Sequence, residues 1–63
     1  MNGKYELAKL LEGKVIKKAD LSNGTVKLEF MDGTRFVREK TFEGMIHATL
    51  YDSIGKTIIS VRI

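Results

Sequence analysis

Glycine recurs at intervals of 9 to 11 residues along the chain, at positions 3, 13, 24, 33, 44 and 55, and proline is absent. Glycine is therefore the strongest local signal for turns, because it adopts the positive φ angles that tight turns require. Segments of this length are typical of short strands joined by turns. The segments between the glycines share β-forming residues but no alignable pattern, so the spacing indicates turns and not a duplicated sequence.

From residue 14 onward, apolar and polar residues alternate with a period of two. The alternation is clearest in VKLEF (26–30), MIHATLY (45–51) and IISVRI (58–63). Each of these patterns predicts a strand with one buried face. The segment 14–21 predicts a less regular strand, and 34–42 predicts a long, charged one.

The first 13 residues follow a different pattern, which predicts a helix. Leu7, Leu10 and Leu11 lie three and four residues apart and share one helix face. Asn2 is a suitable N-cap, and Gly13 is suited to the left-handed position that follows a helix. A helix this short is unstable alone in water, so its leucine face is expected to pack against the strands.

The residues between the strands predict antiparallel hairpins. Asn-Gly at 23–24 and Asp-Gly at 32–33 are strong hairpin signals, and DSIG at 52–55 suits a type I turn. The sequence therefore predicts an α+β fold, in which a short N-terminal helix packs on a five-stranded antiparallel β-meander. The alternative is a small SH3-like or partly open β-barrel with an N-terminal helix.

The register at the 31–33 turn can be predicted from charge. A three-residue loop with Gly33 left-handed places Glu29 opposite Arg35, and Leu28 opposite Phe36. A two-residue loop places two cations, Lys27 and Arg38, opposite each other. Opposite charges facing across strands are favourable by up to about 1 kcal/mol. The three-residue loop is therefore expected.

A chain of 63 residues predicts a single domain covering 1–63 with a marginal core, because such a domain buries only about 60% of its unfolded surface. Disulfides and thiolate metal sites are excluded because cysteine is absent, and one histidine cannot form a zinc site. No cofactor or metal is expected. Self-association is the remaining common source of additional stability.

No run of about 18 apolar residues is present, and the N-terminal segment does not resemble a signal peptide. We therefore expect a cytoplasmic protein with no membrane partner. The string GKT at 55–57 lacks the upstream glycine of a phosphate-binding loop. His47 has no carboxylate two positions away that could orient it for acid–base chemistry. We therefore expect no enzyme activity.

A set of mostly apolar residues alternates out of phase with the expected core and is a candidate protein interface. Its members are Met45, His47, Thr49, Tyr51 and Ile58. Such residues on one sheet face can form a patch that binds another chain. The last strand is also rich in β-branched residues and would invite pairing if it lay at an edge. We therefore expect a binding module that associates with itself and with an unidentified protein.

The formal net charge of +3 arises from residues 13–42, which hold seven basic and four acidic residues. A candidate surface for nucleic acid or an acidic partner consists of Lys17, Lys18, Lys27, Arg35, Arg38 and Lys40. Basic surfaces of this kind attract nucleic acids and acidic proteins. The alternative is a solvated face, on which Asp20, Glu29 and Glu39 pair with these cations across the strands.

Overall fold

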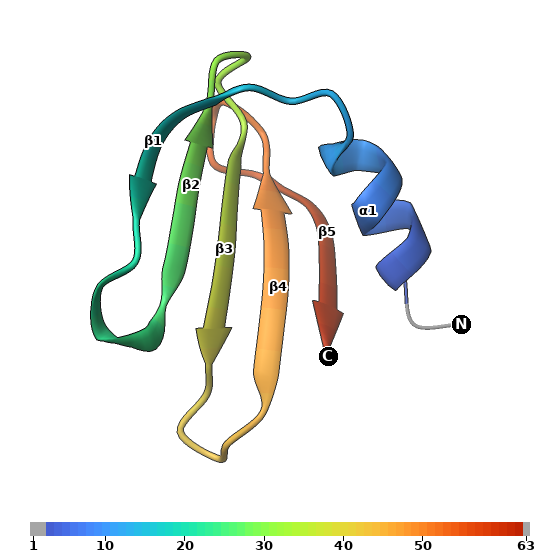
Figure 1. The fold of residues 1–63 in the computed structure, drawn as a ribbon. Coiled ribbons are helices and arrows are strands. Elements are labelled where there is room, and N and C mark those ends of the chain that lie inside the picture. The colour runs from blue at the N-terminus through green and yellow to red at the C-terminus, as the bar shows by residue number, and fades with distance from the viewer. Residues whose placement is uncertain (1–2, 63) are drawn as a thin grey trace.

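The computed structural model of the chain describes residues 3–62. One helix is followed by five strands (Figure 1): α1 (Lys4–Leu11), β1 (Ile16–Asp20), β2 (Val26–Phe30), β3 (Arg35–Lys40), β4 (Ile46–Tyr51) and β5 (Thr57–Arg62). All neighbouring strands are antiparallel, and their spatial order is β1-β2-β3-β4-β5. The predicted α+β fold is confirmed. The sheet is open, because β1 and β5 lie at opposite edges.

The helix is shorter than the 13 residues predicted for it. It begins after Gly3, which has a φ of 77°, and ends at Leu11. Gly13 has the expected left-handed conformation (φ 79°), and the backbone N–H of Lys14 donates to the carbonyl of Leu11 at 3.2 Å. The predicted N-cap, Asn2, lies outside the described residues. No helix within residues 3–62 is long and apolar enough to cross a membrane.

The core is small and lies between α1 and the sheet. The buried residues of the described chain come from the helix and three of the strands: Leu7, Phe30, Ala48, Leu50 and Val61. Leu11, Leu28, Phe36 and Ile59 are half-buried against this cluster. These residues have the alternation predicted for β2, β4 and β5, while the predicted inward residue Ile63 lies outside the described part.

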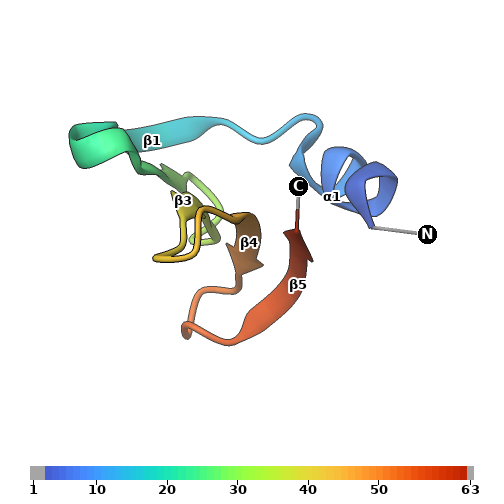
Figure 2. The same ribbon diagram turned by 90° about the horizontal axis from the view of Figure 1, so that it is seen from below.

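The helix covers only one side of the sheet face on which it packs. It contacts β5, and the sheet curves so that β5 approaches the helix (Figure 2). Leu7 is buried, but Leu10 remains 43% exposed. Leu10 therefore does not join the packed leucine face that the sequence predicted, and Leu7 is the buried residue of α1.

The same turn recurs at the three hairpins that connect β2 to β5. In each turn the first residue's N–H donates to the carbonyl of the fifth residue, at 2.9, 2.6 and 2.8 Å. The fourth residue is Gly33, Gly44 or Gly55, with φ between 88° and 89°. The three following strands begin at residues 35, 46 and 57. The glycine spacing thus reflects a repeat of backbone geometry, and in two of the turns the side chain of the first residue, Thr41 or Asp52, also accepts from the N–H of the fifth.

The register between β2 and β3 is the predicted one. Glu29 pairs with Arg35 and Leu28 pairs with Phe36, which requires the three-residue loop. The Gly33 N–H donates to the Phe30 carbonyl at 3.0 Å and closes this loop.

Each edge strand contains one extra residue, a β-bulge. In β5, Tyr51 pairs with Thr57 and Leu50 pairs with Ile59, so Ile58 has no partner in the ladder. In β1, Lys17 is the extra residue. A bulge changes which face the following residues occupy, because side chains alternate with a period of two. The Ile58 bulge therefore places Ile59 and Val61 on the core face, and Ser60 and Arg62 on the outer face.

A mostly buried lysine joins the segment before β1 to the turn between β2 and β3. The Lys14 ammonium donates to the Asp32 carboxylate at 2.5 Å and to the Thr34 hydroxyl at 2.9 Å. It also lies 5.5 Å from the centre of the Phe30 ring. The side chain of Lys14 is only 14% exposed. The hydrogen bond from Lys14, followed by those from Thr34, lowers the pKa of Asp32 well below its ordinary value.

Candidate functional site

The strand register aligns side chains into two rows on the sheet face opposite the core, here called the outer face. The first row is Lys18, Glu29, Arg35 and Tyr51, and the second is Asp20, Lys27, Val37 and Thr49. Each row crosses β1, β2, β3 and β4 in that order. The charged members alternate in sign across β1 to β3, whereas the β4 positions are uncharged.

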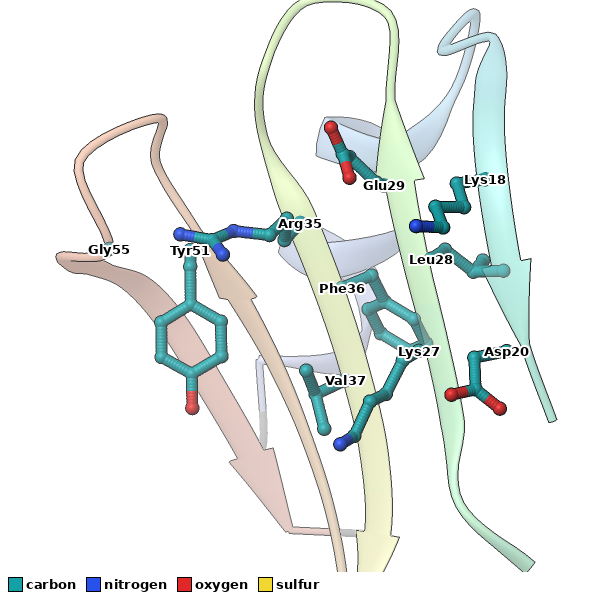
Figure 3. Close-up of a pocket in the computed structure, with 10 residues that line it drawn as sticks. All are labelled: Lys18, Asp20, Lys27, Leu28, Glu29, Arg35, Phe36, Val37, Tyr51 and Gly55. Atoms are coloured by element: carbon teal, nitrogen blue, oxygen red, sulfur yellow. The ribbon is translucent and has the colours of Figure 1, made fainter. Parts of the chain in front are cut away.

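A groove of about 430 Å³ lies on the outer face. Figure 3 shows the residues that line it, with β1 and β2 on one side and the turn between β4 and β5 on the other. The lining consists of Lys18, Asp20, Lys27, Leu28, Glu29, Arg35, Phe36, Val37, Tyr51 and Gly55. Leu28 and Phe36 alternate with the two rows along β2 and β3 and complete the lining.

Both acidic residues of the groove already have partners. The carboxylate of Glu29 lies 3.7 Å from the ammonium of Lys17. The carboxylate of Asp20 accepts hydrogen bonds from the Ser22 hydroxyl at 2.7 Å and the Ser22 N–H at 3.0 Å. These bonds, the side-chain one first, lower the pKa of Asp20. Glu29 is therefore paired with a lysine, whereas Asp20 is held by hydrogen bonds from a neutral serine.

Two cations of the groove, Lys27 on β2 and Arg35 on β3, form no such ion pair within the described chain. Arg35 faces Glu29 in the register, yet neither Arg35 nor Lys27 forms an ion pair with any residue between 3 and 62. A Cβ on Gly55 would lie 3.7 Å from the Nη2 atom of Arg35. The Arg35 guanidinium therefore lies over the β4–β5 turn, beside its cross-strand neighbour Tyr51 (Figure 3).

The six predicted basic residues do not share one face. Lys18, Lys27 and Arg35 line the groove, and Lys17 is bound to Glu29 next to it. Arg38 pairs with the core residue Ala48, and Lys40 follows Arg38 on that same sheet face. The alternation along β3 was a sufficient signal for this separation, because an inward Phe36 also directs the residues two and four positions later inward.

The five residues of the predicted apolar interface lie along β4 and at the bulge of β5. Met45, His47, Thr49 and Tyr51 are half-buried, while Ile58 is 46% exposed. Thr49 and Ser60 share a hydrogen bond at 3.0 Å between their hydroxyls. Tyr51 is the member that lines the groove. This set therefore offers less exposed apolar surface than the sequence suggested.

More apolar surface is exposed along β1 and the adjoining turn. Val15, Ile16, Leu21 and Met31 are between 53% and 67% exposed. Met31 lies next to Val15, because its N–H donates to the Val15 carbonyl at 2.8 Å. Sequence reasoning missed this surface, because the edge position of β1 and the limited reach of α1 are not visible in the residue pattern.

The described chain contains no group of three or more His, Asp or Glu side chains placed to hold a metal ion. Comparison of the chain with protein-family models, with curated proteins and with solved structures finds no match.

Proposed function

We propose that the chain is a non-enzymatic protein-interaction module that acts as a homodimer. The observation that supports this proposal is its large exposed surface. The chain exposes 4688 Å², whereas a compact protein of this mass exposes about 4,100 Å². The chain therefore exposes more surface than a compact fold of its mass, and large apolar side chains form part of that surface.

The surface best suited to a second copy is the group of exposed apolar residues at the edge where β1 begins, with Ile16 on the face of the core residue Phe30. Val15 and Ile16 are 63% and 53% exposed, and Met31 beside them is 64% exposed. The edge itself carries Lys17 and Lys18 together with a bulge, which are features that disfavour the addition of another strand. We therefore place the contact on the apolar side chains and not on an extended backbone ladder.

Light scattering during size-exclusion chromatography tests this proposal with three matched isoleucine variants. The unmodified chain is expected at about twice its mass of 7.1 kDa. Ile16→Lys should give the monomer mass. Ile54→Lys should leave the dimer intact, because Ile54 is 84% exposed at the distant β4–β5 turn.

A monomer mass for the unmodified chain at all concentrations would refute the homodimer. Ile58→Lys is the third variant and tests the outer face of β4 and β5. If Ile58→Lys dissociates the dimer and Ile16→Lys does not, the interface lies on that face, as the sequence predicted, and the β1 contact is wrong.

Nucleic-acid binding is the second candidate. Lys17, Lys18, Lys27 and Arg35 share the outer face with Tyr51, and cations beside an aromatic ring suit single-stranded nucleic acid. Protein binding is preferred because Asp20 and Glu29 lie on the same face, where they would repel phosphates.

A further inference from the structure

We propose that the outer-face groove binds an extended acidic segment of a partner protein, through Arg35, Lys27, Val37 and Tyr51. The inference rests on the proposed function, since it identifies the chemistry of a partner for the same module. It differs from the homodimer contact, which involves the exposed apolar residues at the edge where β1 begins.

Lys27 on β2 and Arg35 on β3 are the two cations that would bind an anionic ligand in this site. Lys27 is the cross-strand neighbour of Val37, and Arg35 is two residues before Val37 on the same outer face. Lys27 faces Asp20 and Arg35 faces Glu29 across the strands, but neither cation forms an ion pair within residues 3–62. A guanidinium binds a carboxylate through two parallel hydrogen bonds, which a lysine ammonium cannot do. Arg35 is therefore the expected primary contact and Lys27 the secondary one.

An apolar floor lies between these cations. Val37 and Tyr51 are half-buried, and Figure 3 shows both on the same side of the sheet as Arg35 and Lys27. Val37 and the Tyr51 ring offer apolar contact to a side chain without requiring a hydrogen bond. The site therefore favours a ligand in which a carboxylate stands next to an apolar residue.

The dimensions of the groove suit a short peptide. Its lining residues extend from β1 to β4, and three spacings between neighbouring strands amount to about 14 Å. An extended peptide advances about 3.3 Å per residue, so roughly four residues cross the groove. In an extended peptide alternate side chains point away from the sheet, so only some of its carboxylates face Asp20 and Glu29, whereas a nucleic acid carries a phosphate at every nucleotide.

Fluorescence anisotropy with the labelled peptide Glu-Glu-Phe-Glu-Glu tests the inference. Arg35→Gln is expected to weaken binding at least tenfold. The matched control is Arg38→Gln, which removes the same charge from the same strand on the opposite face and should change the affinity less than twofold. Raising the salt concentration tenfold should also weaken binding severalfold. Equal effects of the two substitutions would overturn the assignment of the groove.

Two further probes separate the remaining outcomes. The neutral peptide Gln-Gln-Phe-Gln-Gln should not bind at the concentrations used. If a thymidine pentanucleotide binds more tightly than the acidic peptide and is equally sensitive to Arg35→Gln, the groove serves nucleic acid and the proposal is wrong. If the acidic peptide fails to bind while light scattering still gives a dimer, the groove inference fails and the homodimer proposal stands.

Discussion

The two edge strands of the sheet share one local feature and differ in almost everything else. Both β1 and β5 contain a single-residue bulge. In β5, Val61 is 2% exposed and belongs to the core cluster that includes Leu7 of α1. The helix contacts this strand. In β1, all five residues are exposed. A bulge at an edge therefore does not decide whether that edge is packed; the position of the helix does.

The contacts that hold the two edges of the sheet to the rest of the fold are also of different kinds. The β5 edge is held by apolar contacts around Leu7 and Val61. The β1 side is held by the polar contact between Lys14 and Asp32. Apolar packing responds mainly to the area that is removed from water, whereas an ion pair with one half-exposed member responds to salt and pH. Mutations that reduce buried apolar area should therefore destabilise the β5 side most, and acid or salt should destabilise the β1 side most.

Single-residue deletions in β5 should give the largest contrast. With the pairs of Tyr51 with Thr57 and of Leu50 with Ile59 retained, deleting Ser60 moves Val61 opposite Thr49 on the outer face and Arg62 opposite the buried Ala48. The loss of core packing and the burial of a charge should cost more than about 4 kcal/mol, or abolish cooperative unfolding. Urea denaturation followed by circular dichroism measures the effect.

Deleting the bulge residue Ile58 is the matched control. The pairs of Tyr51 with Thr57 and of Leu50 with Ile59 are then retained, so the free energy of unfolding should change by less than about 1 kcal/mol. Similar losses from the two deletions would mean that the bulge does not set the face of β5.

Truncations to alanine on the two sides should differ by a smaller amount. Leu50 is 1% exposed and Ile16 is 53% exposed. Leu50→Ala should destabilise the fold by about 2–5 kcal/mol, because it leaves a cavity. Ile16→Ala should cost under about 1 kcal/mol in the monomer. The comparison is made at protein concentrations too low for association, and equal costs would show that the β1 side is packed as tightly as the β5 side.

Acid should weaken the contact between Lys14 and Asp32 beside β1. This effect should be smaller than those of the deletions and of the alanine truncations. The carboxylate of Asp32 has a lowered pKa in the folded chain, so it stabilises the fold above the ordinary aspartate pKa of about 4. That contribution is lost as the pH falls below this value. Thermal unfolding between pH 5 and pH 2 should show a shallower decline for Asp32→Asn than for the unmodified chain.

The Lys14→Gln variant provides a control for this pH effect. Because Lys14 is the main cause of the lowered pKa, the further change Asp32→Asn should alter the pH dependence little in that background. Identical pH profiles for the unmodified chain and Asp32→Asn would show that the contact contributes nothing to stability.

Alternation and local charge were enough to predict much of the sheet. The period of two placed Phe30, Ala48 and Leu50 inward, and all three are buried. The facing charges of Glu29 and Arg35 predicted the correct β2–β3 register. These features depend on residues close in the sequence or on one hairpin, so the residue pattern contains them.

The edges of the sheet could not be predicted in the same way. A bulge such as Lys17 is defined only against the partner strand, and its effect was to direct Lys17 to Glu29 at 3.7 Å. Arg35 faces Glu29 as predicted, but Glu29 forms its ion pair with Lys17. The candidate groove combines Arg35 and Tyr51, which the sequence had placed in separate surfaces, because their proximity depends on the β3–β4 register.

The attachment of the helix limits how many strands this meander can have. The helix is joined to β1 but packs beside β5, where a Cβ on Gly3 would lie 3.2 Å from Val61. The five peptide steps from Leu11 to Ile16 span at most about 17 Å, and four strand spacings amount to about 19 Å before curvature shortens the path. The recurring turn could add strands indefinitely, but two more would bring this distance to about 29 Å. The short connection before β1 therefore limits the sheet to about five strands if α1 is to pack beside the last strand.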